Sequence, residues 1–411
     1  MSGRTRKGHD RTRVVIAGGG VAALEAALAL RALEEDRFEV ELLAPEPHFW
    51  YRPLAVAEPF ELGEPHRFEL GELAARAGAT HLLGALASVD VSRHEARTAT
   101  GAVLPYDALL LALGALPGSG VHGALTFRGP ADTDAVRGLL ADTAAGGVRR
   151  VVFAVPWGAV WSLPAYELAL LTRSWLQARD LPDVGVALVT PEDEPLQVFG
   201  RRASEVVAGL LVDRGIELRT RAYPSNFREG QLLLVPDGVV EADRVVALPC
   251  LHVPPLDGVP QERDGFVPVD THGRVAGLVD VYAAGDLTTF PVKQGGIAAQ
   301  QADAAAEAIA AAAGVDLVPR PFRPVLRGLL LTGGEPRYLR SEIARPGDAF
   351  QFDTEPLWWP PAKIAGRRLA PFLAEVTGEE LPDEPTLGPG VLPVEVELDP
   401  ELATIGSAPG R

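Results

Sequence analysis

The chain has 411 residues, of which 47% are hydrophobic and 23% charged, which is ordinary usage for soluble domains and enough length for two or three of them. Its 55 acidic residues outnumber its 38 basic ones, so the formal net charge is −17 and most of the surface repels phosphate backbones. We therefore expect no nucleic-acid partner. The single cysteine, Cys250, excludes an intrachain disulfide, a dithiol redox pair and a thiolate metal cluster, and we expect no metal site.

Short apolar strands alternate with helices from Val14 onward. Strands are predicted over residues 14–19, 38–44, 107–114, 148–155, 184–190 and 278–286, and helices over residues 21–33, 166–177 and 296–314. Strand followed by helix, repeated, is typical of parallel sheets with crossover helices. Two such runs start at Val14 and Val148, so we predict an α/β fold with two Rossmann-like domains, the second inserted in the first, and a small C-terminal cap region.

The composition also divides the chain into segments. We expect a basic tail at 1–13, a first domain at 14–125 and 257–318, an inserted domain at 126–256, a cap at 319–378 and an acidic, proline-rich arm at 379–411. In that arm the residues PVEVEL, 393–398, alternate like a strand that would pair with a second subunit, so a homodimer is one expectation.

Nothing in the sequence predicts a membrane span or a cleaved leader. No run approaches the roughly 18 apolar residues that a membrane-spanning helix needs. The apolar stretch after the basic tail contains Glu25 and three consecutive glycines, which is not the continuous apolar helix of a signal peptide. We therefore expect a cytoplasmic location, with peripheral contact to a membrane left open.

The strongest motif is VVIAGGGVAALEAALALR. Gly18, Gly20 and Ala23 match the GxGxxG/A template after a strand, in which the first glycine permits a tight turn and the second lets a pyrophosphate approach the backbone. The helix that starts at Val21 and Ala22 then presents free N–H groups to a phosphate. An acidic residue usually ends the second strand and binds the ribose, but here Ala44 follows Leu43, and Glu46 is the nearby substitute. The alternative for Glu46 is a solvated loop carboxylate.

Two later segments resemble the remaining flavin motifs of the two-dinucleotide-domain flavoproteins. YDALLLALGA contains Ala112 and Gly114 where that group has an ATG sequence, and VDVYAAGD contains Gly285 and Asp286. In that group the aspartate accepts a hydrogen bond from a ribitol hydroxyl of non-covalently bound FAD, and the glycine allows the close approach. The order of the three motifs along the chain predicts FAD.

The whole chain resembles the pyridine nucleotide-disulfide oxidoreductase-like flavoproteins, nearest to sulfide:quinone reductases, flavocytochrome c sulfide dehydrogenases and type II NADH dehydrogenases. The resemblance rests on the segments 189–200, 290–310 and 356–374 and covers most of residues 14–374. Sulfide:quinone reductases relay electrons through cysteines beside the flavin, and Cys250 alone cannot do so. We interpret Cys250 as a small buried hydrophobic residue.

The second domain departs from the type II NADH dehydrogenases. Their second glycine-rich turn is replaced by VVFAVPWGAVWSLPAYELALL, in which Pro156, Trp157 and Trp161 stand where small residues would admit a pyrophosphate. NAD(P)H binding in the usual mode is therefore disfavoured, although Glu192, at the end of the next strand, stands where a ribose-binding carboxylate would.

Two residues are candidates for catalysis. Glu167 follows the second turn, where related enzymes place a glutamate beside the flavin or quinone pocket, and it is either a proton carrier or a first-turn glutamate that complements the helix dipole. Lys293, in PVKQGG with Gln294 and Gly295, is one of three lysines in the chain. Its ammonium would stabilise the anion of reduced flavin; the alternative is a surface lysine.

Aromatic residues near two loops have less specific assignments. His48, Trp50, Tyr51 and Arg52 are expected near the flavin ring, chiefly as packing residues, with Arg52 a candidate cofactor contact. Trp358 and Trp359 lie beside basic residues, which suits a membrane interface, a lid over the flavin or a dimer contact.

The sequence thus predicts an FAD-dependent oxidoreductase that passes electrons through flavin to a small-molecule acceptor such as quinone, with the donor open. Two alternatives remain at this point. One is an NAD(P)H dehydrogenase with a degenerate nucleotide site. The other is a flavin-binding protein that has lost turnover, which the missing redox cysteines and the filled second turn motivate.

Overall fold

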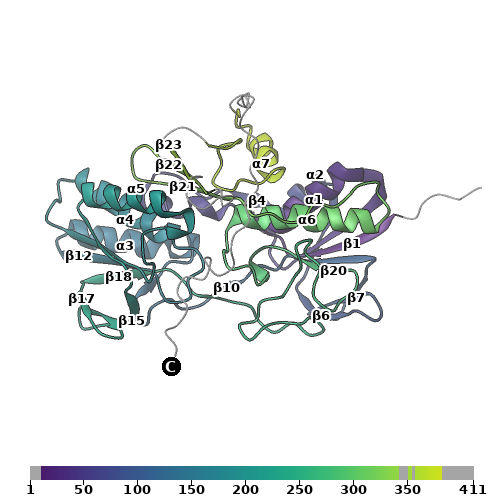
Figure 1. Ribbon diagram of the computed structural model, residues 1–411, viewed down its shortest axis with the longest axis horizontal. Coiled ribbons are helices and arrows are strands. Elements are labelled where there is room, and N and C mark those ends of the chain that lie inside the picture. The colour runs from purple at the N-terminus through teal and green to yellow at the C-terminus, as the bar shows by residue number, and fades with distance from the viewer. Residues whose placement is uncertain (1–10, 342–349, 354–356, 382–411) are drawn as a thin grey trace, which may run out of the picture.

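The computed structural model describes residues 11–341, 350–353 and 357–381, the second of these ranges by its backbone alone. Two α/β lobes lie side by side, and the C-terminal elements lie across them (Figure 1). The basic tail at 1–10 and the predicted strand at 393–398 lie outside the described residues.

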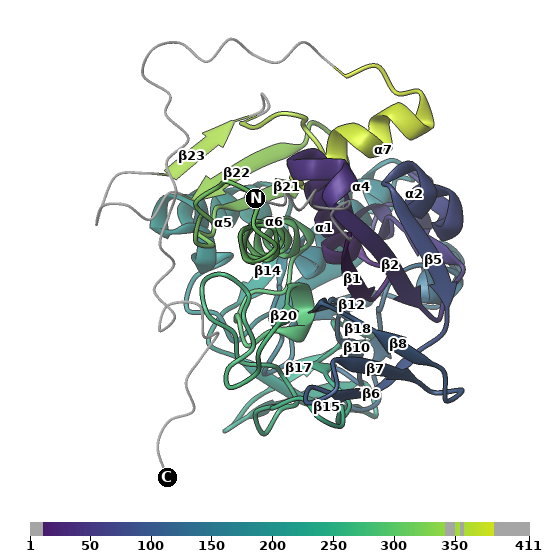
Figure 2. The same ribbon diagram turned by 90° about the vertical axis from the view of Figure 1, so that its right-hand side faces the viewer.

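The first lobe contains a parallel sheet in the order β20-β9-β1-β2-β5. The strands are β1 (Thr12–Ala17), β2 (Phe38–Ala44), β5 (Ala79–Leu83), β9 (Ala108–Leu111) and β20 (Val281–Ala283). The central strands are covered on both faces, which explains why β9 is a continuous apolar run rather than an alternating one. The helices α1 (Val21–Glu34) and α6 (Gly295–Ala312) pack side by side on one face (Figures 1 and 2).

The second lobe repeats the architecture with a parallel sheet in the order β11-β18-β12-β13-β14. The strands are β11 (Leu125–Thr126), β12 (Arg150–Ala154), β13 (Gly185–Val189), β14 (Ile216–Arg219) and β18 (Arg244–Ala247), and the helices are α3 (Thr133–Ala144), α4 (Leu163–Gln177) and α5 (Arg201–Asp213). This arrangement confirms the predicted fold class, because the second sheet is built from residues between the β9 and β20 strands of the first.

Small antiparallel units complete the two lobes. They pair β3 with β4, β10 with β19, β6 through β8 and β15 through β17. The bounds are β3 (His48–Trp50), β4 (Arg67–Glu69), β6 (Leu86–Asp90), β7 (Glu95–Thr98), β8 (Val103–Pro105), β10 (Leu116–Pro117), β15 (Tyr223–Arg228), β16 (Gln231–Val235), β17 (Val239–Glu241) and β19 (Leu251–His252), with the short helix α2 (Leu70–Arg76) beside β5.

The C-terminal region is an antiparallel sheet followed by a helix. The sheet contains β21 (Leu326–Leu330), β22 (Arg337–Ser341) and β23 (Phe350–Asp353), and the helix is α7 (Leu369–Thr377). Residues 357–369, here called the strap, connect this region to both lobes. Glu25 of α1 accepts hydrogen bonds from the backbone nitrogens of Arg368 and Leu369, each at 2.8 Å, and so caps the free N–H groups at the start of α7.

The predicted helix at 166–177 starts earlier than expected, at Leu163. Pro164 lies in its first turn, where the missing N–H has no intrahelical partner to lose. Two of the three added residues, Leu163 and Pro164, line the pocket described below.

Candidate functional site

The glycine-rich turn joins β1 to α1 at the carboxyl edge of the first sheet. Gly18 has φ +134°, and a Cβ there would collide with the carbonyl oxygen of Ala112, so only glycine fits. A Cβ at Gly20 would have no atom within 4 Å, which shows that the space in front of α1 is open. The first N–H groups of α1, at Val21 and Ala22, have no side-chain cap and are directed into this space. The turn therefore has the geometry of a phosphate cradle.

The other two predicted motifs reach the same edge. Ala112 donates its backbone N–H to the Ala17 carbonyl at 2.7 Å, and Gly114 follows with φ +70°. Gly285, with φ +81°, would bring a Cβ to 3.2 Å from the Cβ of Ala22. The crevice between these strands is a topological switch point, because β2 follows on one side of β1 and β9 lies on the other.

Asp286 is the carboxylate of this crevice. Burial raises the pKa of the Asp286 carboxyl, and the charges of Lys293 and Arg52 oppose that shift. Within the described part of the chain its carboxylate is influenced by the charges of Lys293 and Arg52 and by no hydrogen bond, so it is available to a ligand hydroxyl. Glu46 is exposed in the loop after β2. The turn and the open helix end fit the pyrophosphate part of FAD, and the Asp286 carboxylate fits its ribitol part.

Lys293 is buried, with 7% of its surface exposed, which excludes the surface-lysine alternative. Its ammonium donates a hydrogen bond to the Thr288 carbonyl and lies 4.0 Å from the centre of the Phe266 ring. Burial lowers the pKa of Lys293 to about 8, although Asp286 and Asp264 favour its charged form. A compact cation is thus held at the side of the crevice where the Asp286 carboxylate lies.

Gln294 and Gly295 lie between Lys293 and the start of α6. The Gln294 side chain accepts the Ile297 N–H at 3.2 Å as an N-cap and donates to the Arg327 carbonyl at 2.6 Å. Ile364 of the strap contacts Gly295, where a Cβ would approach its side chain to 2.9 Å. The loop that carries Lys293 is therefore fixed to the C-terminal sheet and the strap.

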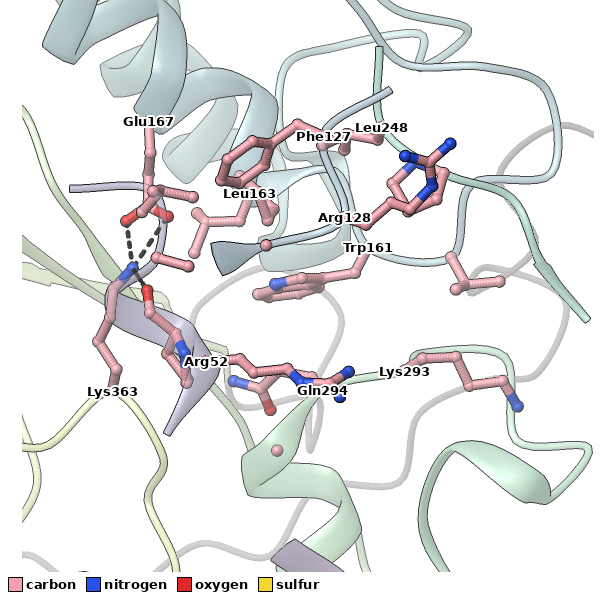
Figure 3. Close-up of a pocket in the computed structure, with 18 of the residues that line it drawn as sticks. Arg52, Phe127, Arg128, Trp161, Leu163, Glu167, Leu248, Lys293, Gln294 and Lys363 are labelled. Atoms are coloured by element: carbon pink, nitrogen blue, oxygen red, sulfur yellow. Dashed lines mark hydrogen bonds and ion pairs between the residues drawn. The ribbon is translucent and has the colours of Figure 1, made fainter. Parts of the chain in front are cut away.

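A cavity of about 260 Å³ opens beside this loop. Its walls are largely apolar and come from both lobes and the C-terminal region, as Figure 3 shows with Trp161 near the middle, Glu167 and Lys363 at one end and Lys293 at the other. Arg52 also lines it, so the cofactor candidates Arg52, Lys293, Gln294 and Gly295 share one pocket. We call this cavity the interlobe pocket.

Glu167 and Lys363 form an ion pair at the end of the interlobe pocket. The Lys363 Nζ lies 2.7 Å from Oε1 and 2.9 Å from Oε2 of Glu167, and the two side chains are 7% and 1% exposed. Lys363 also donates to the Pro53 carbonyl at 3.0 Å, and Leu331 donates its N–H to Glu167 at 2.9 Å. Burial raises the pKa of Glu167, whereas Lys363 and the Leu331 N–H oppose the shift. Glu167 is thus buried in an ion pair at the start of α4, and the proton carrier and the helix-dipole interpretation both stay predictions.

The role of Lys363 is not predicted from the sequence. There it is only a basic neighbour of Trp358 and Trp359, and nothing in the local pattern connects it with Glu167, from which it is separated by 196 positions. Trp358 is 8% exposed, donates its indole N–H to the Ala362 carbonyl at 3.0 Å and packs on Tyr338. Its packing corrects the membrane-interface interpretation for Trp358, because a buried indole cannot enter a headgroup layer.

The second turn, residues 155–162 between β12 and α4, carries two tryptophans that pack on neighbouring aromatic rings. Trp157 packs on Tyr223 with ring centres 5.5 Å apart, and Trp161 packs on Phe199 at 5.9 Å. Pro164 has no N–H, and the N–H of Ala165 donates to the Ser162 carbonyl at 3.0 Å, so two of the early donors of α4 are absent or used.

Glu192, the candidate ribose ligand, is directed inward. It is 1% exposed and accepts hydrogen bonds from the hydroxyls of Ser162 at 2.8 Å, Tyr166 at 2.6 Å and Thr190 at 2.8 Å. A carboxylate with three internal donors has little capacity left for a ribose. The residues of this turn therefore do not fit a nicotinamide dinucleotide in the usual mode.

Cys250 is half-buried, and its thiol donates to the Trp157 carbonyl at 3.4 Å. Burial raises the pKa of the Cys250 thiol, which disfavours the reactive thiolate. Within residues 11–341 and 357–381, no group of acidic, histidine or cysteine side chains has the arrangement of a metal site. Over the described part of the chain, no helix is both long and apolar enough to cross a bilayer.

Comparison with known proteins agrees with this geometry. The model of the pyridine nucleotide-disulphide oxidoreductase family matches residues 12–312. The ferredoxin–NAD(+) reductase subunit of the benzene 1,2-dioxygenase system of Pseudomonas putida is 28% identical over 302 residues, which is 69% of this chain and 68% of that protein. An NADH dehydrogenase-like protein of Mycobacterium tuberculosis is 28% identical over 293 residues, 67% of this chain and 72% of that protein.

Among solved structures, the sulfide:quinone oxidoreductase of Aquifex aeolicus superposes with a TM-score of 0.77 at 18% identity, covering 93% of this chain and 100% of that one. This similarity shows a shared fold that extends through the C-terminal region. The match over residues 12–312 and the paired Rossmann-like sheets establish that the chain belongs to the pyridine nucleotide-disulphide oxidoreductase family.

Proposed function

We propose that this oxidoreductase binds FAD non-covalently in the first lobe and passes electrons through it to a quinone-type acceptor in the interlobe pocket. The observation that carries the proposal is the pocket itself. It connects the Lys293 side of the cofactor crevice with the Glu167–Lys363 pair through largely apolar walls. A flat, apolar molecule with a carbonyl oxygen has the chemistry to fill it.

The residues that would hold FAD are those of the crevice. The N-terminus of α1 would bind the pyrophosphate, Asp286 would accept a hydrogen bond from a ribitol hydroxyl, and the Lys293 ammonium would stabilise negative charge on the ring system. FAD supplies two-electron chemistry that none of this chain's side chains provides. Glu46, Gly114 and Arg52 remain candidate contacts.

The Glu167–Lys363 pair provides the proton chemistry. Reduction of a quinone to a hydroquinone takes up two electrons and two protons, so an apolar pocket needs a group that delivers protons. Glu167 is held between burial, which favours its neutral form, and Lys363, which favours the carboxylate. We assign it the role of passing the two protons in turn from the Lys363 ammonium to the acceptor oxygens, and Lys363, whose side chain is 7% exposed, regains each proton from solvent.

The test is single-turnover reoxidation. Purified protein is reduced anaerobically with dithionite and mixed with decylubiquinone while the flavin absorbance is followed. Wild-type protein is expected to reoxidise rapidly, and Glu167→Gln is expected to keep its FAD and slow the reaction by about 10²–10⁴-fold. The matched control is Glu205→Gln, because Glu205 pairs with Arg201 on the exposed surface of α5. Equal rates in wild type and Glu167→Gln would contradict the assignment.

The electron donor is open, and one candidate is NADH, which the names of the Pseudomonas putida and Mycobacterium tuberculosis relatives favour. The turn at 155–162, with its two packed tryptophans, opposes it. We therefore expect NADH and NADPH to reduce the flavin slowly or only at high concentration, measured anaerobically by flavin bleaching. Rapid reduction at micromolar NADH would make an NAD(P)H dehydrogenase the better account.

A further inference from the structure

The carboxylate at the end of β13 has an unusual environment for its place in a Rossmann-like domain. Glu192 is buried, and burial raises the pKa of its carboxyl, while hydroxyl donors oppose that shift. A buried carboxylate is costly unless its oxygens are bonded. Here Oε1 accepts from Ser162, and Oε2 accepts from Tyr166 and Thr190. The chain itself supplies the hydroxyls that a bound ribose would offer.

Two of these hydroxyl donors are sequence neighbours of the pocket residues. Ser162 directly follows Trp161, and Tyr166 directly precedes Glu167. Trp161 and Glu167 both line the interlobe pocket, whereas Ser162 and Tyr166 are turned away from it toward Glu192. The Glu192 carboxylate therefore holds the first turn of α4 from the side opposite the pocket. It binds the residue after Trp161 and the residue before Glu167.

The Tyr166 hydroxyl is itself held in place. It accepts the N–H of Leu196 at 3.3 Å while donating to Glu192, and the Tyr166 ring is fully buried. Rotation of the start of α4 would break these bonds together. The position of Glu167 opposite Lys363 is thus determined by two opposed groups, Lys363 in front of the helix and Glu192 behind it.

We propose that Glu192 is a positioning residue for the interlobe pocket rather than a nucleotide ligand. Through Ser162 and Tyr166 it holds Trp161 and Glu167 in the geometry that the acceptor requires. This inference rests on the proposed function of the pocket and adds that the ribose-binding position of the second lobe serves the acceptor site.

The test compares Glu192→Gln and Tyr166→Phe with wild type and with Asp193→Asn. Asp193 is the adjacent carboxylate, but it pairs with Arg221 at 2.9 Å on the surface. The amide that Glu192→Gln introduces cannot accept all three hydroxyls. Tyr166→Phe removes two hydrogen bonds, to Glu192 and from the Leu196 N–H, without changing the ring. We measure kcat, KM and the pH profile for decylubiquinone reduction, with FAD content and melting temperature as folding controls.

We expect Glu192→Gln to lower kcat by about 10- to 100-fold and to move the pH midpoint, because a small displacement of Glu167 disturbs its pairing. Tyr166→Phe should change kcat and the pH midpoint in the same direction by smaller amounts. Asp193→Asn should match wild type. If melting temperature falls while kcat, KM and pH profile stay unchanged in both variants, the role is only structural and the proposal is wrong.

Calorimetric titration with NADH tests whether Glu192 is instead a ribose ligand, and it needs no quinone turnover. Binding to wild type that Glu192→Gln abolishes would show that Glu192 is a ribose ligand and would overturn the proposal. Absence of binding in both proteins supports it. Failure of the wild type to react with quinone would instead count against the proposed function, and the titration would still decide whether Glu192 is committed internally.

Discussion

At the scale of single residues, Lys293 is the cation that we expect to stabilise the anion of reduced flavin. Its ammonium is buried beside the crevice and is partly offset by Asp286 and Asp264. A cation a few ångströms from the anion of reduced flavin contributes on the order of 1–4 kcal/mol. Lys293→Met should therefore lower the two-electron potential of the bound flavin by about 20–90 mV, measured by dye equilibration, while FAD stays bound. Lys293→Arg should restore part of the difference.

The same residue gives a pH dependence with a defined sign. Because the pKa of Lys293 is lowered to about 8, its side chain is charged below that pH and neutral above it. The difference in potential between wild type and Lys293→Met should be largest at about pH 6–7 and shrink above about pH 8. A difference that is constant from about pH 6 to pH 10 would show that the charge of Lys293 is not its cause.

Cys250 provides a negative test at the same scale. Its thiol is half-buried against the Trp157 carbonyl, and its raised pKa disfavours the thiolate. Cys250→Ser should leave FAD content and quinone reduction near the wild-type values, measured by absorbance and steady-state rate. Loss of flavin reduction in this variant would indicate thiol chemistry, which would require pairing between two molecules.

At the scale of elements, the strap joins parts that are distant in the sequence. Lys363 connects Glu167 of the second lobe with the Pro53 carbonyl of the first, and Ile364 donates its N–H to the Tyr51 hydroxyl at 3.0 Å. The strap therefore holds the two lobes at a fixed spacing around the pocket. Glu25 extends this connection to α1 by capping α7.

A double-mutant cycle measures that connection. Lys363→Met leaves Glu167 buried without its partner, so it should lower the free energy of unfolding by about 3–5 kcal/mol. Glu167→Gln in the same chain removes the unpaired charge and should recover a large part of that loss. Denaturant titration of the four proteins checks this, and additive effects of the two substitutions would show that the pair is not coupled.

The motifs of the first lobe could be predicted because they are local. Gly18, Gly20 and their turn follow from a backbone requirement that a few adjacent residues meet, and Asp286 follows from the strand that precedes it. Lys363 and the inward turn of Glu192 could not be predicted in this way. Both depend on tertiary contacts that connect separate elements, and the pattern around Glu192 is the same whether its carboxylate faces a ribose or three internal hydroxyls.

At the scale of the whole molecule, the two lobes share one architecture but differ in the turn between the first strand and helix of each. The first turn, at 18–20, is short and open in front of its helix, whereas the turn at 155–162 is longer and carries two tryptophans that pack on Tyr223 and Phe199. We therefore propose that the first lobe holds the cofactor, while the second forms a wall of the interlobe pocket. Residues of the strap and of β21 line the remaining side.

Flavin content tests this division between the lobes. Gly20→Asp places a carboxylate in the open space before α1, where it repels a pyrophosphate, so the purified variant should lose its yellow colour. Gly158→Asp places the same carboxylate in the second turn, where a Cβ also meets no atom within 4 Å although the backbone φ is +82°, and it should retain FAD. Absorbance after denaturation quantifies the released flavin, and equal loss in both variants would contradict the division.

In the proposed function electrons leave through flavin to an acceptor in the interlobe pocket, and anaerobic stopped-flow spectroscopy follows that step in a single turnover. Wild-type protein containing FAD is reduced with dithionite and mixed with decylubiquinone, and flavin absorbance is recorded. We expect full recovery of oxidised flavin, with one hydroquinone formed per flavin, and a much slower recovery in Glu167→Gln. Reduced flavin that persists in the presence of decylubiquinone would contradict it.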